Sequence, residues 1–308
     1  MDCRTGRGIA GFLPSGELTL GKLSADYRFM EYNILHQAEG YANEKYLSMD
    51  LNDRKTEIAK IINNTAPDVL FLAERFEEWD GIGNGSVDLM AALNSDYALI
   101  ENEITYSLSA GGTATATNRS PIVYNTKVFK VIESGYVFLT DVDPPEYTTA
   151  KRCVTWAILE DITETEAKGT RIAVFGTHWS VGKHWTTGES LEEMRIQEAE
   201  EMSDLIKSDK FKGLPVITGG DFNSHYTSET KTECYVTLLE SAGLVDVSAA
   251  MATEEKPYIY GGVDHFAVSG CTVESFTIIW NTLDYASDHN PIYCDIKCDT
   301  KIDIYEVN

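Results

Sequence analysis

The chain is poor in basic residues. Lysine and arginine number 25 against 49 aspartates and glutamates in 308 residues, which gives a formal net charge of −24 at pH 7. A protein that grips long nucleic acid through counterion release normally carries a basic face. The charge therefore argues against processive binding to a polyanion. It leaves room for a nuclease only if a divalent cation and local arginines reverse the field at the site.

Closely spaced cysteine pairs are absent as well. No C-x-x-C motif occurs, which argues against a zinc knuckle. Cys294 and Cys298 are four residues apart in a predicted strand and its exit, about 13 Å if extended, which is too far for a disulfide without a turn. We expect buried free thiols, and the cysteines do not indicate whether the protein works in a reducing or an oxidising compartment. The six cysteines are Cys3, Cys153, Cys234, Cys271, Cys294 and Cys298.

Long apolar runs and linkers are also missing. No run approaches the roughly 20 residues of a membrane span. The first 26 residues contain no apolar core of the signal-peptide type, so we expect no signal peptide, and both a secreted and a cytoplasmic location stay open. There is no internal repeat and no linker rich in proline and serine. We expect an N-terminal arm over residues 1–26 and one monomeric domain over residues 27–308.

What is present is a globular composition, with 43% hydrophobic residues, arranged in short apolar runs. Alternating or continuous runs predict strands, and 3.6-residue periodicity predicts helices. A capping-box signature, Ser190-Leu-Glu-Glu193, opens the second helix. The small, polar segment 111–118 predicts a mobile loop. Strands are expected at 28–35, 68–73, 97–104, 121–124, 130–139, 153–159, 171–177, 216–217, 263–268, 274–280 and 292–296, and helices at 52–64, 190–207 and 228–242.

The segment from Val216 to Ser224 combines a buried strand with polar residues at its end. Val216 and Ile217 run into two glycines, which allow a sharp turn and a close approach of the backbone. Asp221 and Asn223 then fall on one face if the strand continues. Together they offer an anionic acceptor and a neutral donor, which suits a water or a phosphate oxygen. The alternative is a turn that Asp and Asn merely cap.

Other polar residues share this position at the end or the start of an apolar strand. Carboxylate and amide oxygens suit Mg²⁺, Mn²⁺ or Ca²⁺ rather than zinc, and histidines exchange protons near neutral pH. Hydrolysis of a phosphate ester needs a cation, a base for water and a donor to the leaving oxygen. The candidates are Asn33, Glu74, His178, Asp221, Asn223, Asp264, Asp288 and His289.

The order YNIL, LAE, THW, GGDFNS, VDHFAVSG and SDHNP resembles the endonuclease/exonuclease/phosphatase superfamily, from about residue 27 to residue 297. GDFN followed by SDH-x-P is the most specific part of this resemblance. The resemblance implies a DNase-I-like α/β fold, a four-layer sandwich of two packed mixed β-sheets flanked by helices. It also implies a divalent-metal phosphoesterase whose site crosses the upper edges of both sheets.

The resemblance implies a role for each candidate. Asn33, Glu74 and Asp288 would hold Mg²⁺ or Mn²⁺, Glu74 most directly. Arg152 matches an arginine that family members point at phosphate, and a guanidinium fork suits phosphate oxygens. Arg119 is a weaker candidate of the same kind.

The same resemblance implies the catalytic groups. His289 would activate or orient the attacking water, held by a hydrogen bond to Asp264. Asp221 and Asn223 would position the water and the phosphate. His178 would stabilise the phosphoryl oxygens or protonate the leaving group. A satisfied core histidine is the alternative for His178.

Two residues depart from the family pattern. Ala73 stands where a glutamine is common, which removes one polar contact beside Glu74. Asn118-Arg119 stands close to where nuclease relatives offer a glutamate to the first histidine. If Asn118 occupies that place, the role of His178 as an acid is open.

These patterns predict a metal-dependent enzyme that hydrolyses a phosphodiester, with nucleic acid as the first substrate class. The acidic charge supports an alternative, a small or lipid-linked phosphate ester of the sphingomyelinase or inositol-phosphatase type. A non-catalytic binding module that kept the fold is the third reading.

Overall fold

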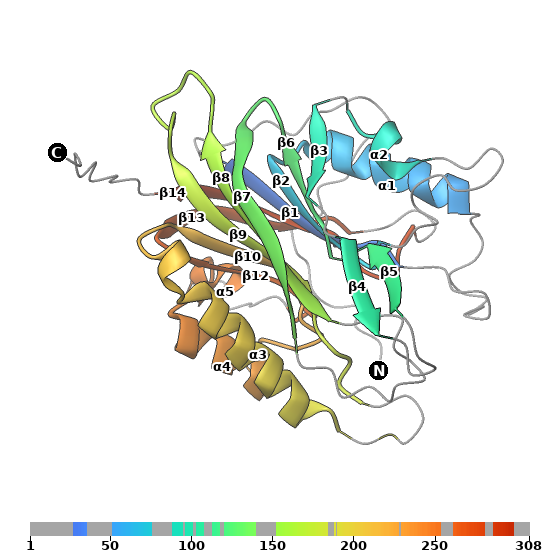
Figure 1. Ribbon diagram of the computed structural model, residues 1–308, viewed down its shortest axis with the longest axis vertical. Helices are drawn as coiled ribbons and strands as arrows, with labels where there is room; N and C mark the ends of the chain where they lie inside the picture. Colours follow the sequence, from blue (N-terminus) through green and yellow to red (C-terminus); the bar gives the residue numbers. More distant parts are fainter. Residues whose placement is uncertain are drawn as a thin grey trace.

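Continuous apolar runs form the central strands of two six-stranded sheets, which pack face to face (Figure 1). The computed structural model describes residues 27–35, 51–75, 88–94, 96–100, 103–107, 113–117, 120–139, 152–183, 188, 190–227, 229–253, 261–280 and 286–298, without the side chains of 51, 103–107 and 113–117. The expected arm, residues 1–26, and the Asn118-Arg119 pair lie outside the described residues.

Sheet one is mixed, because β1 and β2 run parallel while its other neighbours are antiparallel. Its strands follow in the order β13 (Cys271–Ile278), β14 (Ile292–Cys298), β1 (Tyr27–Asn33), β2 (Val69–Ala73), β6 (Ile122–Asn125) and β3 (Tyr97–Ile100).

Sheet two is also mixed, with β10 and β9 parallel and the other pairs antiparallel. Its strands follow in the order β11 (Val245–Asp246), β12 (Asp264–Ser269), β10 (Val216–Asp221), β9 (Arg171–His178), β8 (Cys153–Asp161) and β7 (Phe129–Phe138).

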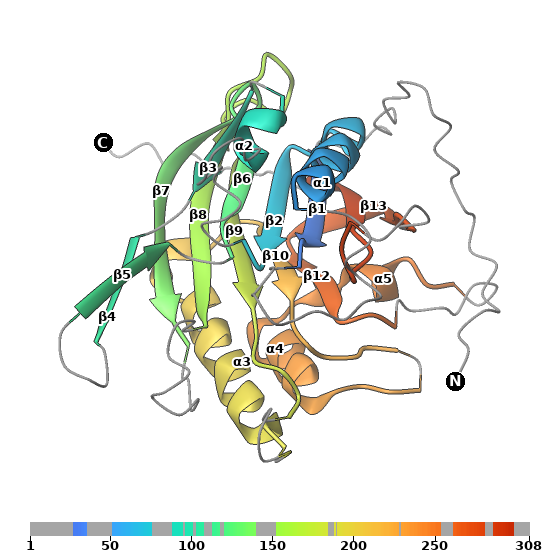
Figure 2. The same cartoon turned by 90° about the vertical axis from the view of Figure 1, so that its right-hand side faces the viewer.

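Helices cover the outer face of each sheet, which completes the predicted four layers (Figure 2). α1 (Leu51–Thr65) and the short α2 (Leu89–Ala92) lie on sheet one, while α3 (Glu192–Ile206) and α4 (Glu233–Ala242) lie on sheet two. A 3₁₀ turn (Asp209–Phe211) and α5 (Val247–Ala250) are short additions. Among the described residues, no helix is long and apolar enough to cross a membrane.

Strand alternation divides the core into three apolar layers. Phe29, Phe71 and Phe266 meet between the sheets. Met30, the next residue along β1, faces α1 instead, as the two-residue period of a strand requires. On the far side, Phe175 and its neighbours pack against α3 and α4. The inward face of β1 therefore continues from Phe29 through Glu31 to Asn33.

The two glycines of β10 are required by close approach, as the sequence predicts. A Cβ on Gly219 would lie 2.3 Å from Cδ2 of Phe71 in the opposite sheet. A Cβ on Gly220 would lie 2.1 Å from the carbonyl oxygen of Thr177 on the neighbouring strand. Neither position accommodates a side chain, so β10 lies unusually close to both neighbours.

Three local expectations are wrong. The single strand expected at 97–104 is two strands, β3 and β4 (Glu103–Ser107). The expected loop at 111–118 contains β5 (Thr113–Thr117), which pairs antiparallel with β4. Alternating β-branched threonines favour an extended strand over a loop, despite the small size of these residues. The helix expected at 228–242 begins later, at Glu233, because an isolated bridge between Tyr226 and Lys231 holds the preceding chain in a turn.

The capping box at Ser190 does not form either. The N-cap residue of α3 is Leu191, and it makes no side-chain cap hydrogen bond. Ser190 pairs with Lys183 in an isolated bridge, and its hydroxyl accepts from the amide of Glu192 at 3.3 Å. The tertiary bridge therefore moves the start of the helix by one residue from the position that the motif indicates.

Candidate active site

Strand register brings the predicted polar residues of sheet two to one edge. Asp221 ends β10 directly opposite His178, the last residue of the parallel strand β9. It also lies opposite Asp264, the first residue of the antiparallel strand β12. One end of the sheet therefore carries a histidine and two carboxylates side by side.

Sheet one delivers its residues to the same edge. Asn33 ends β1 opposite Ala73, and Glu74 follows at once after β2. Leu35, Glu74 and Asn223 all have left-handed backbone conformations, with φ of 53°, 62° and 49°. Such conformations are unfavourable for residues with a side chain, and they concentrate at functional sites. The chain turns sharply where it leaves β1, β2 and β10.

The carboxylate of Asp221 is the centre of the polar contacts. Its Oδ1 accepts from the backbone amide of Asn223 at 2.8 Å. Its Oδ2 accepts from Nδ2 of Asn33 at 2.9 Å, which links the two sheets. Nε2 of His178 lies 3.4 Å from the same oxygen, and Nε2 of His289 lies 3.9 Å from it. His178 is itself buried, and its ring contacts this buried carboxylate.

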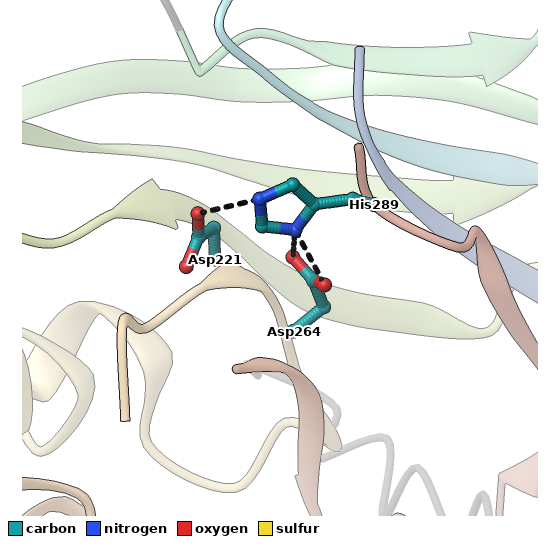
Figure 3. A group of neighbouring side chains, drawn as sticks. All are labelled: Asp221, Asp264 and His289. Atoms are coloured by element: carbon teal, nitrogen blue, oxygen red, sulfur yellow. Dashed lines mark hydrogen bonds and ion pairs between the residues drawn. The ribbon is translucent and has the colours of Figure 1, made fainter. Parts of the chain in front are cut away.

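Asp264 holds the ring of His289 from the other side (Figure 3). Nδ1 of His289 lies 2.8 Å from Oδ2 and 3.0 Å from Oδ1 of Asp264. With Nδ1 bonded to a carboxylate, Nε2 is directed toward Asp221 and is the nitrogen that can exchange a proton. The side chain of His289 is 19% exposed, whereas those of Asp221 and Asp264 are each 3% exposed. His289 is therefore the most solvent-accessible member of this group.

Asn33 is held at both ends of its amide. Nδ2 donates to Oε1 of Glu74 at 3.1 Å as well as to Asp221, and Oδ1 accepts from the amide of Leu35 at 3.0 Å. In this arrangement the nitrogen faces the carboxylates. A cation shared by Asn33 and Glu74 requires the amide to turn over, so that its oxygen replaces its nitrogen.

Several carboxylates share the site, and burial together with neighbouring charge raises the pKa of three of them. Burial, followed by the charge of Asp264, raises the pKa of Asp221. Burial, followed by the charges of Asp264 and Asp221, raises the pKa of Glu31 well above 4.5. Burial also raises the pKa of Asp288, and the charge of Glu74 adds to this. A cation bound among these carboxylates would stabilise their ionised forms.

The pKa of His289 is raised for the same reason. Burial alone would lower it, but the charge and hydrogen bond of Asp264, together with the charges of Asp221 and Asp288, outweigh burial. The imidazole therefore holds its proton to a higher pH than an ordinary histidine.

The donor set suits a divalent metal ion. Asp221, Asp264 and His289 each offer a ligand atom, and these atoms lie within 4.8 Å of one another. Glu74 and Asp288 add carboxylate oxygens nearby. Glu74 shares the amide nitrogen of Asn33 with Asp221, and Asp288 lies 4.0 Å from Nε2 of His289. Oxygen-rich sets of this kind match hard cations such as Mg²⁺, Mn²⁺ and Ca²⁺.

Comparison with known sequences decides the family. The sequence profile of the endonuclease/exonuclease/phosphatase family matches residues 30–289, which include all of the site described above. The chain belongs to this family. Its members are phosphoric ester hydrolases and generally depend on a divalent metal, so the chain is a phosphoesterase of the endonuclease/exonuclease/phosphatase family. No curated protein sequence matches the chain at a significant level.

Solved structures agree on the fold of this family member. The catalytic domain of human nocturnin, solved with a bound sulfate anion, is 20% identical, with a TM-score of 0.63 over 88% of this chain and 94% of that one. A mannosyl-6-phosphatase from Bacteroides thetaiotaomicron is 19% identical, with a TM-score of 0.59 over 88% and 99%. A family protein from Bacteroides vulgatus is 21% identical, with a TM-score of 0.60 over 89% and 99%. The TM-scores and the length of the matched chains establish the DNase-I-like sandwich.

Glu31 is a buried acid in this family member that the motifs do not reveal. It is fully buried on the inward face of β1, two residues before Asn33, and neither carboxylate oxygen has a hydrogen-bond partner in the described part of the chain. The charges of Asp264, Asp221 and His289 all act on its pKa, so Glu31 lies close to this cluster. The strand period was the available signal, since residues i and i−2 share a face.

Arg54 and Ser287 position the loops of sheet one. Arg54 is buried in α1 and donates to the carbonyl oxygens of Ile34, Leu35 and Ala286. Ser287 donates to the carbonyl of Asn33 at 2.6 Å and accepts from the amide of His289 at 3.2 Å. Arg54 lies four residues before Ile58, on the apolar stripe of its helix. A charged residue on an apolar stripe is the sequence signal that could have indicated a buried, hydrogen-bonded arginine.

The helices behind sheet two hold its loops in the same way. Glu198 of α3 is buried and accepts from both the amide (3.1 Å) and the hydroxyl (2.7 Å) of Ser180, two residues after His178. Arg195 donates to the carbonyl of Asn223. His265 is a structural residue on the outward face. Its Nε2 lies 2.8 Å from the carbonyl oxygen of Ser224, and its Nδ1 lies 3.3 Å from Asp246.

Three predicted residues lie farther from the carboxylate of Asp221 or contact it only through the backbone, namely Asn223, Asp288 and Arg152. Nδ2 of Asn223 donates to the carbonyl of Trp179 at 2.8 Å, which ties the loops after β9 and β10 together. Oδ1 of Asp288 lies 4.0 Å from Nε2 of His289. Arg152 directly precedes β8, next to the His178 end of β9, and its carbonyl accepts from the amide of Leu139. Arg152 therefore lies at the predicted edge of sheet two.

Proposed function

We propose that the protein hydrolyses a phosphodiester by attack of a water molecule that His289 activates. The observation that carries this proposal is the position of Asp221. Its Oδ2 lies between the two histidines and accepts from Asn33, while Asp264 orients His289 from behind. The proposed base His289, its orienting carboxylate Asp264 and the pair of His178 and Asn33 thus all lie around the carboxylate of Asp221. Hydrolysis requires such a convergence of a base and polar groups.

The residues divide the work as follows. Nε2 of His289 accepts the proton of the attacking water, and Asp264 keeps Nδ1 protonated and stabilises the resulting imidazolium. Asp221 and Asn223 orient the water and the phosphate. His178, beside Asp221, donates to a phosphoryl oxygen or to the leaving oxygen. Arg152 offers its guanidinium to the phosphate from the adjacent strand.

Glu74 and Asp288, with Asn33, are the proposed ligands of Mg²⁺ or Mn²⁺. When bound, the cation neutralises charge on the phosphoryl oxygens. Burial, and after it the charge of neighbouring carboxylates, raises the pKa values of Asp288 and Asp221, and a cation here would offset both effects.

Charge favours a diester over a monoester. The site gathers the carboxylates of Glu31, Glu74, Asp221, Asp264 and Asp288. A phosphomonoester carries about −1.5 to −2 charges near neutral pH, whereas a diester carries one. The diester is repelled less, so it is the first candidate, and nucleic acid is one source of such a bond.

A small or lipid-linked phosphate ester is the second candidate. The observation that favours it is the net charge of −24, which opposes the approach of a polyanion. The structural neighbour from Bacteroides thetaiotaomicron described as a mannosyl-6-phosphatase is matched over 99% of its length, so that a sugar phosphate also belongs among the substrates to be tested.

Turnover of bis-p-nitrophenyl phosphate with Mg²⁺ or Mn²⁺ tests the proposal. His289→Ala and Asp221→Ala are each expected to lower kcat by roughly 10²–10⁴-fold, since each removes a group that acts in the transition state. Asp204→Ala on α3, whose side chain is 81% exposed, is the matched control and should leave turnover unchanged. Equal turnover in the parent and both site variants would contradict the proposal. No turnover with any divalent metal would support a binding module instead.

A substrate comparison then separates the two candidates. Initial rates on plasmid DNA, RNA, sphingomyelin and sugar phosphates are measured at low and high salt with the same metal. Faster cleavage of a nucleic acid supports the first candidate, and faster release of inorganic phosphate or phosphocholine supports the second.

A further inference from the structure

We propose that Cys271 and Cys298 form a cross-strand disulfide when the protein meets an oxidising medium. The two residues lie directly opposite each other in the antiparallel pair β13 and β14. Their sulfur atoms are 3.5 Å apart, and no disulfide joins them in this structure. The pair lies at the far end of sheet one from the catalytic residues and is independent of the proposed function.

The backbone already has the geometry that a disulfide needs. Directly opposed residues of an antiparallel pair have Cα atoms about 4.5–5.5 Å apart, inside the range of about 4.4–6.8 Å found in disulfides. The sulfurs must approach by roughly 1.5 Å to reach bonding distance, which a small side-chain rotation provides. Cys294, by contrast, lies opposite Phe276 in the same ladder, so no cysteine faces it.

Exposure also allows the reaction. Cys271 is half-buried, whereas Cys298 is 5% exposed. The thiolate of Cys271 attacks a low-molecular-weight disulfide such as glutathione disulfide, forms a mixed disulfide and releases one thiolate. The thiolate of Cys298 then attacks the sulfur of Cys271 and expels the second thiol. The protein loses two electrons and two protons, and the oxidant is reduced to two thiols.

The disulfide would link the edge strand β13 covalently to its neighbour β14. β13 is the outermost strand of sheet one and pairs with β14. Closing the chain from Cys271 to Cys298 encloses Asp288 and His289 in one covalent loop. A loop of this length lowers the entropy of the unfolded chain, and the melting temperature is expected to rise on the order of 5–10 °C.

Thiol counting and peptide mapping test the proposal. The folded protein is incubated with glutathione disulfide and then denatured, and the expected count of free thiols falls from six to four, the number of cysteines minus two. Cleavage after Asp and Glu places every cysteine on its own peptide, so the linked peptides are identified by mass. A link between Cys271 and Cys298 is expected. Six remaining thiols, or a link to another cysteine, would overturn the proposal.

Single variants separate the bond from general effects of oxidation. Cys271→Ser should keep five thiols after oxidation and should lose the rise in melting temperature. Cys153→Ala, in β8, is the matched control, because it removes a buried thiol outside the β13–β14 pair and should retain the link. A rise in melting temperature that persists in Cys271→Ser would contradict the assignment.

Discussion

At the scale of single residues, the carboxylate of Asp264 sets both the orientation of the His289 ring and the pKa of that ring. Asp264 contacts Nδ1 of His289 with both of its oxygens. The same contact raises the pKa of the imidazole. Orientation and basicity therefore come from one side chain, which can be tested by changing its charge without its shape.

Asp264→Asn is expected to lower the pKa of His289 in the metal-free protein. The variant removes the charge and the hydrogen bond that raise this pKa, while burial, which lowers it, remains. NMR titration of the ring in the presence of EDTA measures the change, with Asp204→Asn as the control. Turnover should fall by roughly 10²–10⁴-fold, because an amide no longer fixes the tautomer. An unchanged pKa would refute this account.

Glu31 gives the metal-free protein a pH-dependent stability. Its pKa is raised by burial above 4.5, so the unfolded chain releases the proton at a lower pH than the folded protein does. Its contribution to stability is therefore fully present below about pH 4.5 and is lost as the pH rises through the folded pKa. At neutral and alkaline pH, Glu31 destabilises the fold.

Glu31→Gln should therefore raise the melting temperature at pH 8 in EDTA, on the order of 2–5 °C. At this pH the buried glutamate must either ionise without solvation or hold a proton that the unfolded chain would release, and both cost free energy of folding that the neutral glutamine avoids. At pH 4.5 the gain should be small. Thermal unfolding of both proteins across this pH range measures it. A gain that is equal at both pH values would show that the charge of Glu31 is not the cause.

At the scale of elements, helices hold the loops that carry the site. α1 reaches both loops of sheet one through Arg54, and α3 reaches both loops of sheet two through Glu198 and Arg195. Each helix therefore links chain segments that are distant in sequence. Packing of these helices positions the proposed catalytic groups as much as the strands do.

Arg54→Met should lower the free energy of unfolding by roughly 3 kcal/mol, because buried carbonyl oxygens lose a charged donor. Urea unfolding measures this change, and Lys60→Met on the exposed side of the same helix is the control. Turnover should fall as well, since the loops carrying Asn33 and His289 lose their common support. Wild-type stability in Arg54→Met would show that these hydrogen bonds contribute little.

The sequence predicted those strands and helices whose position depends on a local pattern of apolar residues. The apolar runs at β2, β9 and β10 and the stripe of α1 lie where expected, since burial on one or both faces leaves a period in the sequence. The pairing of β4 with β5 and the bridge at Ser190 are tertiary events, so the local rules failed there. Motifs indicated polar residues that the fold brings to one edge, but Glu31 and Arg54 acquire their importance only from neighbours that the fold supplies.

At the scale of the whole molecule, charge governs which substrates can approach. The net charge of −24 opposes any polyanion, and the carboxylates of the site add to the repulsion. If the substrate is nucleic acid, a divalent cation must assist binding as well as catalysis. This separates the protein from nucleases that bind through a basic face.

Binding of a fluorescent DNA duplex to the His289→Ala variant tests this consequence. We expect affinity in Mg²⁺ and little or none in EDTA at the same ionic strength. Fluorescence anisotropy measures both, and serum albumin, another acidic protein, is a control for non-specific adsorption. Equal affinity with and without the metal would show that a local basic surface overcomes the net charge.

The contact between Gly219 and Phe71 limits how this protein can vary. The ring occupies the volume that a side chain at residue 219 would need, so the separation of the two sheets beside the site depends on a matched pair of sizes. Replacing the glycine alone would wedge β10, which carries Asp221, away from β2, which leads into Glu74. In relatives, a larger residue at the position of Gly219 is therefore expected to occur together with a residue smaller than phenylalanine at the position of Phe71.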